Sequence, residues 1–171
     1  MNVSELLIES FDRLPALVRA AVQGLDAERL RWAPAPAANS VGWLVWHLTR
    51  VQDHHVSALL DQEQVWVSDD WASRFGLDPD PHNTGYAHTP DQVAAVRPDS
   101  ARVLVDYYDA VHARTLQFLR GLTPEDLDRV VDERWDPSVT LGVRLVSVVN
   151  DDTQHVGQAA YVRGLHQRTG R

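Results

Sequence analysis

The stretch from Val148 to Tyr161, VVNDDTQHVGQAAY, places two acids and a histidine inside a helical apolar repeat. Asp151 and Asp152 precede His155 by four and three residues. On a helix, a side chain four residues before His155 lies one turn away on the same face. Because a buried carboxylate is costly unless it is paired or binds a metal ion, the spacing has two explanations. Either Asp151 forms a hydrogen bond with a core histidine, or the two side chains are metal ligands.

Helix geometry favours Asp151 over Asp152 as the partner of His155. At roughly 100° per residue, Asp151 is offset from His155 by about −40° and Asp152 by about +60°. The smaller offset turns Asp151 more nearly toward the side that His155 faces. Asp152 stays open as an alternative, because helix geometry alone does not choose between the two.

His47 is the candidate for a third ligand, on a different helical segment. It follows Leu44 by three residues and precedes Val51 by four, so it shares their apolar stripe. Two imidazoles and one carboxylate with an open position suit Zn²⁺ with a bound water, or Fe²⁺ and Ni²⁺. We therefore predict a divalent metal site at His47, Asp151 and His155. The alternative is that each histidine only satisfies a hydrogen bond in the core.

Other residues are expected to line a pocket beside this site. His54 lies on the same helix face as His47 but about 10 Å farther along the axis, too far to share one ion readily. Trp66 and Trp71 belong to a long connection and would cover the pocket. Core filling is the alternative role for both tryptophans.

Four segments with apolar residues at helical spacing would carry these side chains. They run from about Val3 to Gln23, from Asn39 or Ser40 to about Leu60, from near Ser100 to about Leu119, and from near Thr140 to about His166. Gly24 and Gly121 are expected to end the first and third, and Pro15 to bend or split the first. No segment shows clear strand alternation, so we expect an all-α four-helix bundle.

The connection from Asp61 to Asp99 is unusually long and contains many Trp, Pro, Gly and His residues. Connections of this length are usually functional or disordered, and the aromatic content favours an ordered one. Short helices are expected around 70–75 and after Pro90. The sequence does not decide whether this connection is a lid over the site or a contact between subunits.

Composition excludes several classes of protein. A chain of 171 residues is expected to form one domain, 1–171, and no apolar run approaches the roughly 20 residues of a membrane span. The net charge of −8 and the lack of a basic cluster argue against nucleic-acid binding. The first residues do not resemble a signal peptide, so we expect a cytoplasmic protein. Without cysteine, any thiol chemistry must use a thiol that a substrate brings.

Two of these segments resemble the metal-bearing helices of the DinB-like superfamily. They are NSVGWLVWHLTRVQD, Asn39 to Asp53, and VSVVNDDTQHVGQAAYVRGL, Val146 to Leu165. Between them, VWVSDDWASRFGLD and HNTGYAHTP resemble the actinobacterial branch of DinB-like mycothiol transferases. The similarity covers nearly the whole chain. It implies a four-helix bundle, usually dimeric, with three protein ligands around a divalent metal.

Carried over to this sequence, the resemblance places the ligands at His47, Asp151 and His155. Many relatives have histidine at the position of Asp151. An anionic ligand lowers the net charge of the metal centre and should leave its bound water less acidic than a neutral ligand set would. This departure bears more on the identity of the metal than on the existence of the site.

The resemblance also implies a function, in which the metal activates a low-molecular-weight thiol for attack on an electrophile in detoxification. The thiol is mycothiol in actinobacteria and bacillithiol in related groups. Coordination to Zn²⁺ deprotonates a thiol whose pKa is near 8.5, which agrees with a chain that has no cysteine. We therefore expect an S-transferase with Zn²⁺, a homodimer, and Arg50 or Arg74 in contact with polar groups of the thiol.

Two other functions fit the same residues. A metal-dependent hydrolase or isomerase would hold hydroxide on the same ion and act without added thiol. A non-catalytic, stress-related metal-binding protein would close the coordination sphere with a fourth protein ligand, for which His54 and Asp152 are the candidates. The fold by itself does not choose among these functions.

Overall fold

The computed structural model describes residues 1–169, and in it the first predicted helix is two helices. They are α1, Val3–Asp12, and α2, Leu14–Val22. Pro15 stands in the first turn of α2, where its missing N–H leaves no helical hydrogen bond unmade, so it splits the segment at Arg13. Gly24 follows with a φ of 74°, a left-handed conformation that suits glycine.

The other three long helices agree with the predicted segments. They are α4, Val41–Leu60, α8, Ala101–Arg120, and α9, Leu141–Thr169. Ser40 caps α4 and Ser100 caps α8, each accepting a hydrogen bond from the backbone N–H three residues later. The predicted all-α class is confirmed.

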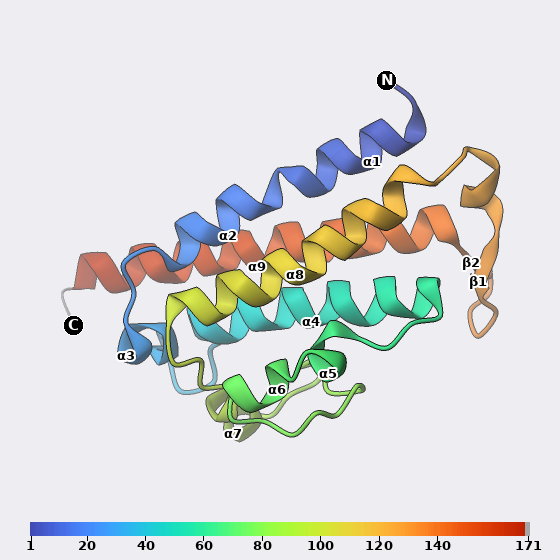
Figure 1. Cartoon of the computed structure of the whole chain (residues 1–171). Helices are drawn as coiled ribbons and strands as arrows, with labels where there is room; N and C mark the ends of the chain where they lie inside the picture. The colour runs from blue at the N-terminus through green and yellow to red at the C-terminus, as the bar shows by residue number, and fades with distance from the viewer. Residues whose placement is uncertain (170–171) are drawn as a thin grey trace.

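The four long elements form a bundle in which each packs against two neighbours. Helix α4 packs against α8 and α9, while α1 and α2 pack against the opposite sides of α8 and α9. Figure 1 shows that α4 and α8 run in the same direction, whereas α9 runs antiparallel to α4. After α4 the chain must therefore return along the bundle, about 30 Å for a helix of this length, before α8 begins. This return explains why the connection between them is long.

The connection itself is ordered and carries three short helices. They are α5, Val65–Ser68, α6, Trp71–Arg74, and α7, Pro90–Ala95. The predicted helices around 70–75 and after Pro90 are confirmed as α6 and α7. Helix α5 was not predicted, because tertiary contacts described below hold its first turn in place.

Smaller elements complete the chain. They are α3, Ala27–Arg31, a 3₁₀ helix η1, Glu125–Asp128, and strands β1, Val130–Asp132, and β2, Val139–Thr140. The strands form an antiparallel pair in which Val130 lies opposite Thr140 and Asp132 opposite Val139. No strand was predicted, since pairs this short show no alternation that a sequence pattern can detect. The hairpin lies at the end of the bundle where α9 begins (Figure 1).

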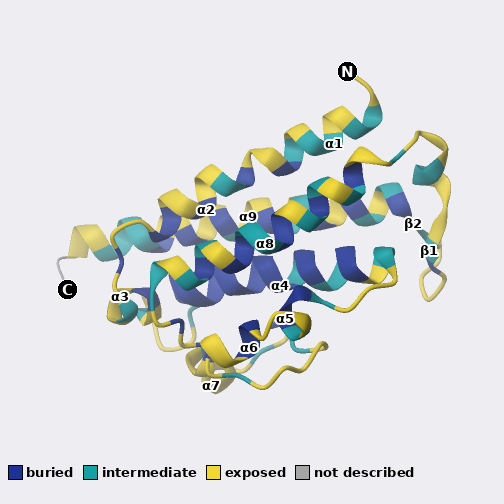
Figure 2. Cartoon of the chain, in the orientation of Figure 1, coloured by how far each residue is buried: buried dark blue, intermediate teal, exposed yellow. Residues whose placement is uncertain are grey.

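Burial is uneven among the long helices (Figure 2). Helix α4 is buried over most of its surface, whereas α1 and one side of α9 are largely exposed. The core also takes in the connection, through Trp66, Ala72 and Phe75. Within residues 1–169, no helix has both the length and the hydrophobicity needed to cross a bilayer.

Candidate metal centre

The structure brings His47, Asp151 and His155 together between the antiparallel helices α4 and α9. One potential ligand atom from each lies within 4.8 Å of the others. His47 is 6% exposed, while the side chains of Asp151 and His155 are 33% and 18% exposed. The three residues, called here the three-ligand site, therefore lie where the core meets solvent. Asp152 is not among them and is fully buried in the core.

The ring of His47 is held by the long connection. Its Nδ1 lies 2.5 Å from the carbonyl oxygen of Thr84, and because a carbonyl only accepts, Nδ1 must donate. The lone pair of His47 is then on Nε2. Trp43 stacks on the same ring at a centroid distance of 4.6 Å and an interplanar angle of 11°. A hydrogen bond of this kind is the usual way in which a metal-binding histidine is oriented.

Gly85 allows the connection to pass this close. A Cβ built at Gly85 would lie 2.7 Å from Nδ1 of His47 and 2.9 Å from the ring of Trp46. Its φ of 92° is also a conformation that residues with a side chain rarely adopt. Only glycine lets the Thr84 carbonyl approach His47.

His155 has the same tautomer for a different reason. Its Nδ1 lies 2.9 Å from the backbone carbonyl of Asp151, one turn earlier, so Nδ1 donates and Nε2 carries the lone pair. Burial lowers the pKa of His47 and keeps that ring neutral. For His155, burial is outweighed by the adjacent carboxylate and backbone carbonyl of Asp151, which raise its pKa. The two rings are 4.5 Å apart between centroids.

The carboxylate of Asp151 is incompletely satisfied, which is the feature that fits a cation. Its Oδ2 is buried and has no hydrogen-bond partner among residues 1–169, although His155 Nδ1 lies 3.2 Å away. A buried carboxylate oxygen without a donor is unfavourable, and a divalent cation would stabilise it. Two imidazole nitrogens and one carboxylate oxygen are a ligand set that Zn²⁺, Fe²⁺ and Ni²⁺ accept.

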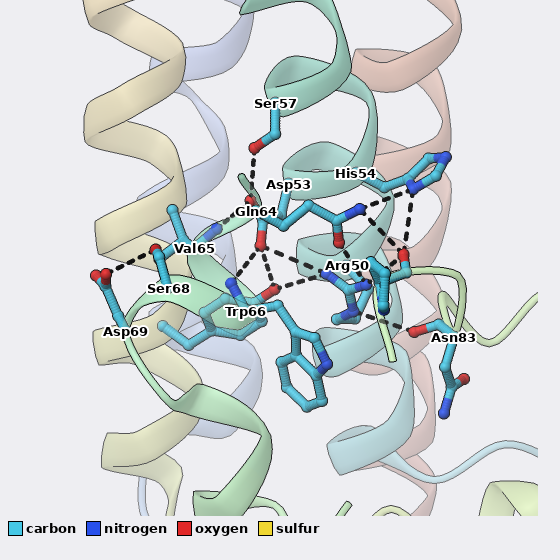
Figure 3. A network of polar contacts seen from close by, with 12 residues as sticks. Arg50, Asp53, His54, Ser57, Gln64, Val65, Trp66, Ser68, Asp69 and Asn83 are labelled. Carbon is cyan, nitrogen blue, oxygen red and sulfur yellow. Dashed lines mark hydrogen bonds and ion pairs between the residues drawn. The ribbon is translucent and has the colours of Figure 1, made fainter. Parts of the chain in front are cut away.

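Arg50, expected at the mouth of the site, lies instead at 0% exposure in the core. Figure 3 shows its guanidinium enclosed by a polar network. All five N–H groups donate, to Asn83 O, Pro81 O, Gln64 Oε1, Tyr107 Oη and Asp53 Oδ2. A guanidinium with every donor engaged has none left for a substrate, and its expected position is corrected.

Asp53 is the other charged member of this network. Its carboxylate accepts from the backbone N–H groups of Val65 and Trp66 at 3.0 and 2.8 Å, and from the hydroxyls of Ser57 and Tyr107 at 3.1 and 2.8 Å. These bonds hold the first turn of α5 against α4 (Figure 3). The Arg50 network, meaning Arg50, Asp53 and these partners, thus ties the connection to the bundle.

The same network positions the segment that holds His47. Arg50 binds the carbonyls of Pro81 and Asn83, and the next two residues are Thr84 and Gly85, which contact the histidine. Asn83, Thr84 and Gly85 were not among the predicted site residues. The glycine in HNTGY was the available signal, but its partner ring comes from a different element.

The aromatic residues expected to cover the site fill the core instead. Trp66 is 0% exposed, with the Arg50 guanidinium 4.9 Å from its ring, and Trp71 is 7% exposed and 5.3 Å from the ring of Tyr107. Arg74 lies on the outer side of Trp71, 4.3 Å from its ring. The alternative of core filling describes both tryptophans.

His54 has the place expected of a pocket residue, on a cavity distinct from the three-ligand site. It is half-buried on α4 and lies with His55 against the segment 129–134. Like Asp152, it does not join the three-ligand site. Among the described residues, three side chains could therefore serve as ligands here, and two of them are partly exposed.

Comparison with known proteins agrees with this geometry. The sequence profile of the DinB superfamily matches residues 10–159, which include all three ligands. A solved structure described as "Crystal structure of the conserved protein of locus from Enterococcus faecalis" is 34% identical, with a TM-score of 0.89, and the match covers 100% of this chain and 99% of that one. No curated protein matches the sequence. The superfamily binds divalent metals, and the described residues contain a possible site. Because the profile matches most of its length, the chain belongs to the DinB superfamily.

Proposed function

We propose that this protein is a divalent-metal-dependent S-transferase that conjugates a low-molecular-weight thiol to an electrophile in detoxification. The observation that carries the proposal is the three-ligand site itself. It lies at the edge of the core, where two of its three residues are partly exposed, and contains a buried carboxylate oxygen that has no hydrogen-bond donor among residues 1–169. Zn²⁺ is the proposed ion, with Ni²⁺ and Fe²⁺ as alternatives, and mycothiol is the proposed thiol.

The chemistry expected of the metal suits a chain without cysteine. When bound, a divalent cation lowers the pKa of a coordinated thiol from near 8.5, so that thiolate is available at neutral pH. His47 and His155 would hold the cation through Nε2, and Asp151 through its carboxylate. Thr84 and Trp43 keep the His47 ring oriented and cover its Nδ1 edge and one face.

The number of ligands favours catalysis over a structural role. Structural zinc sites are closed by four protein ligands, whereas catalytic sites keep a position for water or substrate. His54 and Asp152, the two candidates for a fourth ligand, are outside the three-ligand site. This observation supports an enzyme but does not by itself choose thiol transfer over hydrolysis.

Metal content and thiol binding test the proposal together. We would measure metals by plasma mass spectrometry in untagged wild type, His155→Ala and His82→Ala, whose histidine is exposed in the connection. About one ion per chain is expected in the wild type and in His82→Ala, and none in His155→Ala. Mycothiol is then titrated into the wild type and conjugation of a model electrophile is followed.

Each outcome has a defined meaning. Metal-dependent conjugation that needs mycothiol supports the transferase. Turnover of an ester or amide without added thiol would replace it with the hydrolase. A wild type that binds no metal would reject both enzymes and return His47, Asp151 and His155 to a role in packing.

We also propose that the protein is a homodimer in which α9 packs against α9 of a second copy. An exposed stripe on α9 repeats at alternating intervals of three and four residues, the spacing with which two helices pack side by side. It consists of Val143, Val146, Asn150, Thr153, Gly157 and Ala160. Val143 and Val146 are 53% and 59% exposed, which is high for valine, and the small residues allow close approach of two helices.

Light scattering tests this interface directly. The wild type is expected at twice the chain mass, and Val146→Glu at the chain mass, because two like charges would face one another. The matched control is Val130→Glu, at an exposed valine outside α9. A wild type that is monomeric at all concentrations would remove the proposal.

A further inference from the structure

A cavity of about 430 Å³ opens beside the hairpin, where three segments distant in sequence meet. Its polar lining comes from α4, from β1 with its flanking residues, and from the start of α9. These residues are His54, His55, Arg129, Asp132, Arg134 and Arg144, and the cavity is called here the arginine pocket. None of the functions considered above uses it.

The arginine pocket and the three-ligand site lie along the same pair of helices, α4 and α9. His54 follows His47 by seven residues on α4, and Arg144 precedes Asp151 by seven residues on α9. Seven residues are two helical turns, which return to the same face about 10 Å farther along the axis. Because α4 and α9 are antiparallel, both displacements run in the same direction (Figure 1). The pocket and the metal ligands are therefore neighbours on one face of the α4–α9 pair.

Asp132 organises two of the arginines. Its Oδ1 accepts from Nε of Arg134 at 2.9 Å, and its Oδ2 accepts from Arg134 and Arg144 at 2.8 and 2.9 Å. These bonds hold the pKa of the Asp132 carboxyl well below its usual range, so it stays charged. Arg129, by contrast, has no ion-pair partner in the part of the chain that the structure describes. Three guanidiniums and one carboxylate leave a charge of +2, in a chain whose net charge is −8.

His54 lies in the wall of the same cavity, and the connection holds its ring. Arg50 donates to Oε1 of Gln64 at 2.7 Å, which orients the Gln64 amide so that its Nε2 donates to Nδ1 of His54 at 3.1 Å. Nδ1 of His54 also lies 3.4 Å from the carbonyl oxygen of Pro81, so the connection holds this ring through Nδ1, and Nε2 has no bond in Figure 3. The charged donors of the cavity lining belong to the three arginines, and the Asp132 carboxylate is already engaged with two of them.

We propose that the arginine pocket binds an oxyanion, a carboxylate or a phosphate, carried by the molecule that reacts at the three-ligand site. The positive charge and the hydrogen-bond donors of the arginine pocket both favour a negatively charged ligand that accepts hydrogen bonds. Guanidinium groups pair with carboxylate and phosphate oxygens in the same planar geometry. The anionic group would lie about 10 Å from the reacting atom, which selects an elongated substrate with an acidic end. The identity of that substrate rests on the proposed function, whereas anion binding does not.

Anion binding is measured first on its own, in metal-free and zinc-loaded protein, by amide chemical shifts. The probes are inorganic phosphate, succinate and the neutral analogue succinamide. We expect saturable shifts in residues 54–59, 129–134 and 144 with an anion and none with succinamide. The tighter of the two anions assigns the class, phosphate or carboxylate.

Two arginine variants separate a built site from general charge attraction. Arg129→Gln has no ion pair to lose and should fold, and it is expected to weaken anion binding by about 5- to 10-fold. Arg102→Gln removes the same charge from α8, where the side chain is 87% exposed, and should bind like the wild type. Binding that does not saturate, or that both variants weaken equally, overturns the proposal.

A second readout ties the pocket to the reaction. With a pair of electrophiles that differ only as carboxylate and amide, Arg129→Gln should raise KM for the carboxylate alone and leave kcat unchanged. If anions bind but no conjugation occurs with any thiol, the proposed function fails and the anion site stands. If conjugation occurs and no anion binds, the arginine pocket alone is rejected.

Discussion

Two polar clusters on α4 begin only three residues apart and differ in one respect. The two charged side chains of the Arg50 network are fully buried, and each is satisfied: Arg50 uses all five donors, and the Asp53 carboxylate accepts from four other groups as well. The three-ligand site is partly exposed, and Oδ2 of Asp151 has no hydrogen-bond donor in the described part of the chain. Each cluster contains a basic side chain and an acid three or four residues apart on one helix: Arg50 and Asp53 in the first, His155 and Asp151 in the second.

The difference shows how a structural cluster can be told from a functional one. A buried charge network that is complete within the protein has no remaining capacity for a ligand, and it rigidifies the elements that it joins. A site with an acceptor that no donor in the protein engages can bind a cation through that acceptor. The two clusters therefore differ less in residue type than in whether their hydrogen-bonding groups all have partners within the protein.

The largest expected effect comes from removing the acid of the Arg50 network. Asp53→Ala leaves the Arg50 charge buried without its carboxylate and frees the first turn of α5. We expect a loss of about 3–5 kcal/mol in the free energy of unfolding, measured with urea. Asp69→Ala, an exposed acid in the same connection, is the control and should change little. A loss below about 1 kcal/mol for Asp53→Ala would mean that the network does not hold the connection.

Replacing the acid of the three-ligand site should instead affect metal binding strongly and stability little. Asp151→Ala is expected to weaken zinc binding by about 100-fold or more, because it removes a direct ligand. The free energy of unfolding of the metal-free protein should change by less than about 1 kcal/mol, since only a partly exposed pair is lost. Calorimetric zinc titration and urea unfolding of one preparation test both parts. If Asp151→Ala lost as much free energy of unfolding as Asp53→Ala, the proposed difference between the two clusters would be wrong.

Gly85→Ala probes the link between the clusters. A methyl group 2.7 Å from His47 Nδ1 must displace the Thr84 carbonyl. We expect zinc affinity to fall by about 10- to 100-fold, through loss of the ring's orientation. Gly76→Ala is a matched control, because its φ of 67° imposes similar backbone strain while open space surrounds the added Cβ. Equal zinc affinity in the two variants would show that the connection does not orient His47.

The smallest expected effect concerns pH and the arginine pocket. Burial, and then the charge of Arg144, lower the pKa of His55 from 6.5 to about 4. The folded state therefore resists protonation of His55 more than the unfolded state does. The resulting stability is complete above about pH 6.5 and is lost as the pH falls from 6.5 to 4.

His55→Gln tests this by removing the titrating ring. The wild type should lose about 1–2 kcal/mol more than His55→Gln on acidification from pH 6.5 to 4, allowing for the solvent-exposed part of the ring. Urea unfolding at several pH values measures the difference, and His82→Gln, at an exposed histidine, should follow the wild type. Parallel curves for wild type and His55→Gln would contradict the burial of His55 beside Arg144.

The sequence by itself determined the long helices and the three candidate metal ligands. Apolar spacing and caps such as Ser40 act within one segment, so the bounds of α4, α8 and α9 follow from local pattern. The separation of four residues between Asp151 and His155 likewise sets their common face without reference to the rest of the chain. His47 was found because it lies on an apolar stripe, which any helix packed in a core must bury.

The tertiary structure alone decided the role of the residues that partner across elements. Arginine is most often found on the surface, so the sequence does not mark Arg50 as buried. Only the path of the connection places acceptors from Gln64, Pro81 and Asn83 around it. Gly85 matters because His47 of another element lies against it, and the arginine pocket exists because a short hairpin folds beside the antiparallel pair α4 and α9. Such contacts depend on where distant segments meet, and no local periodicity encodes that.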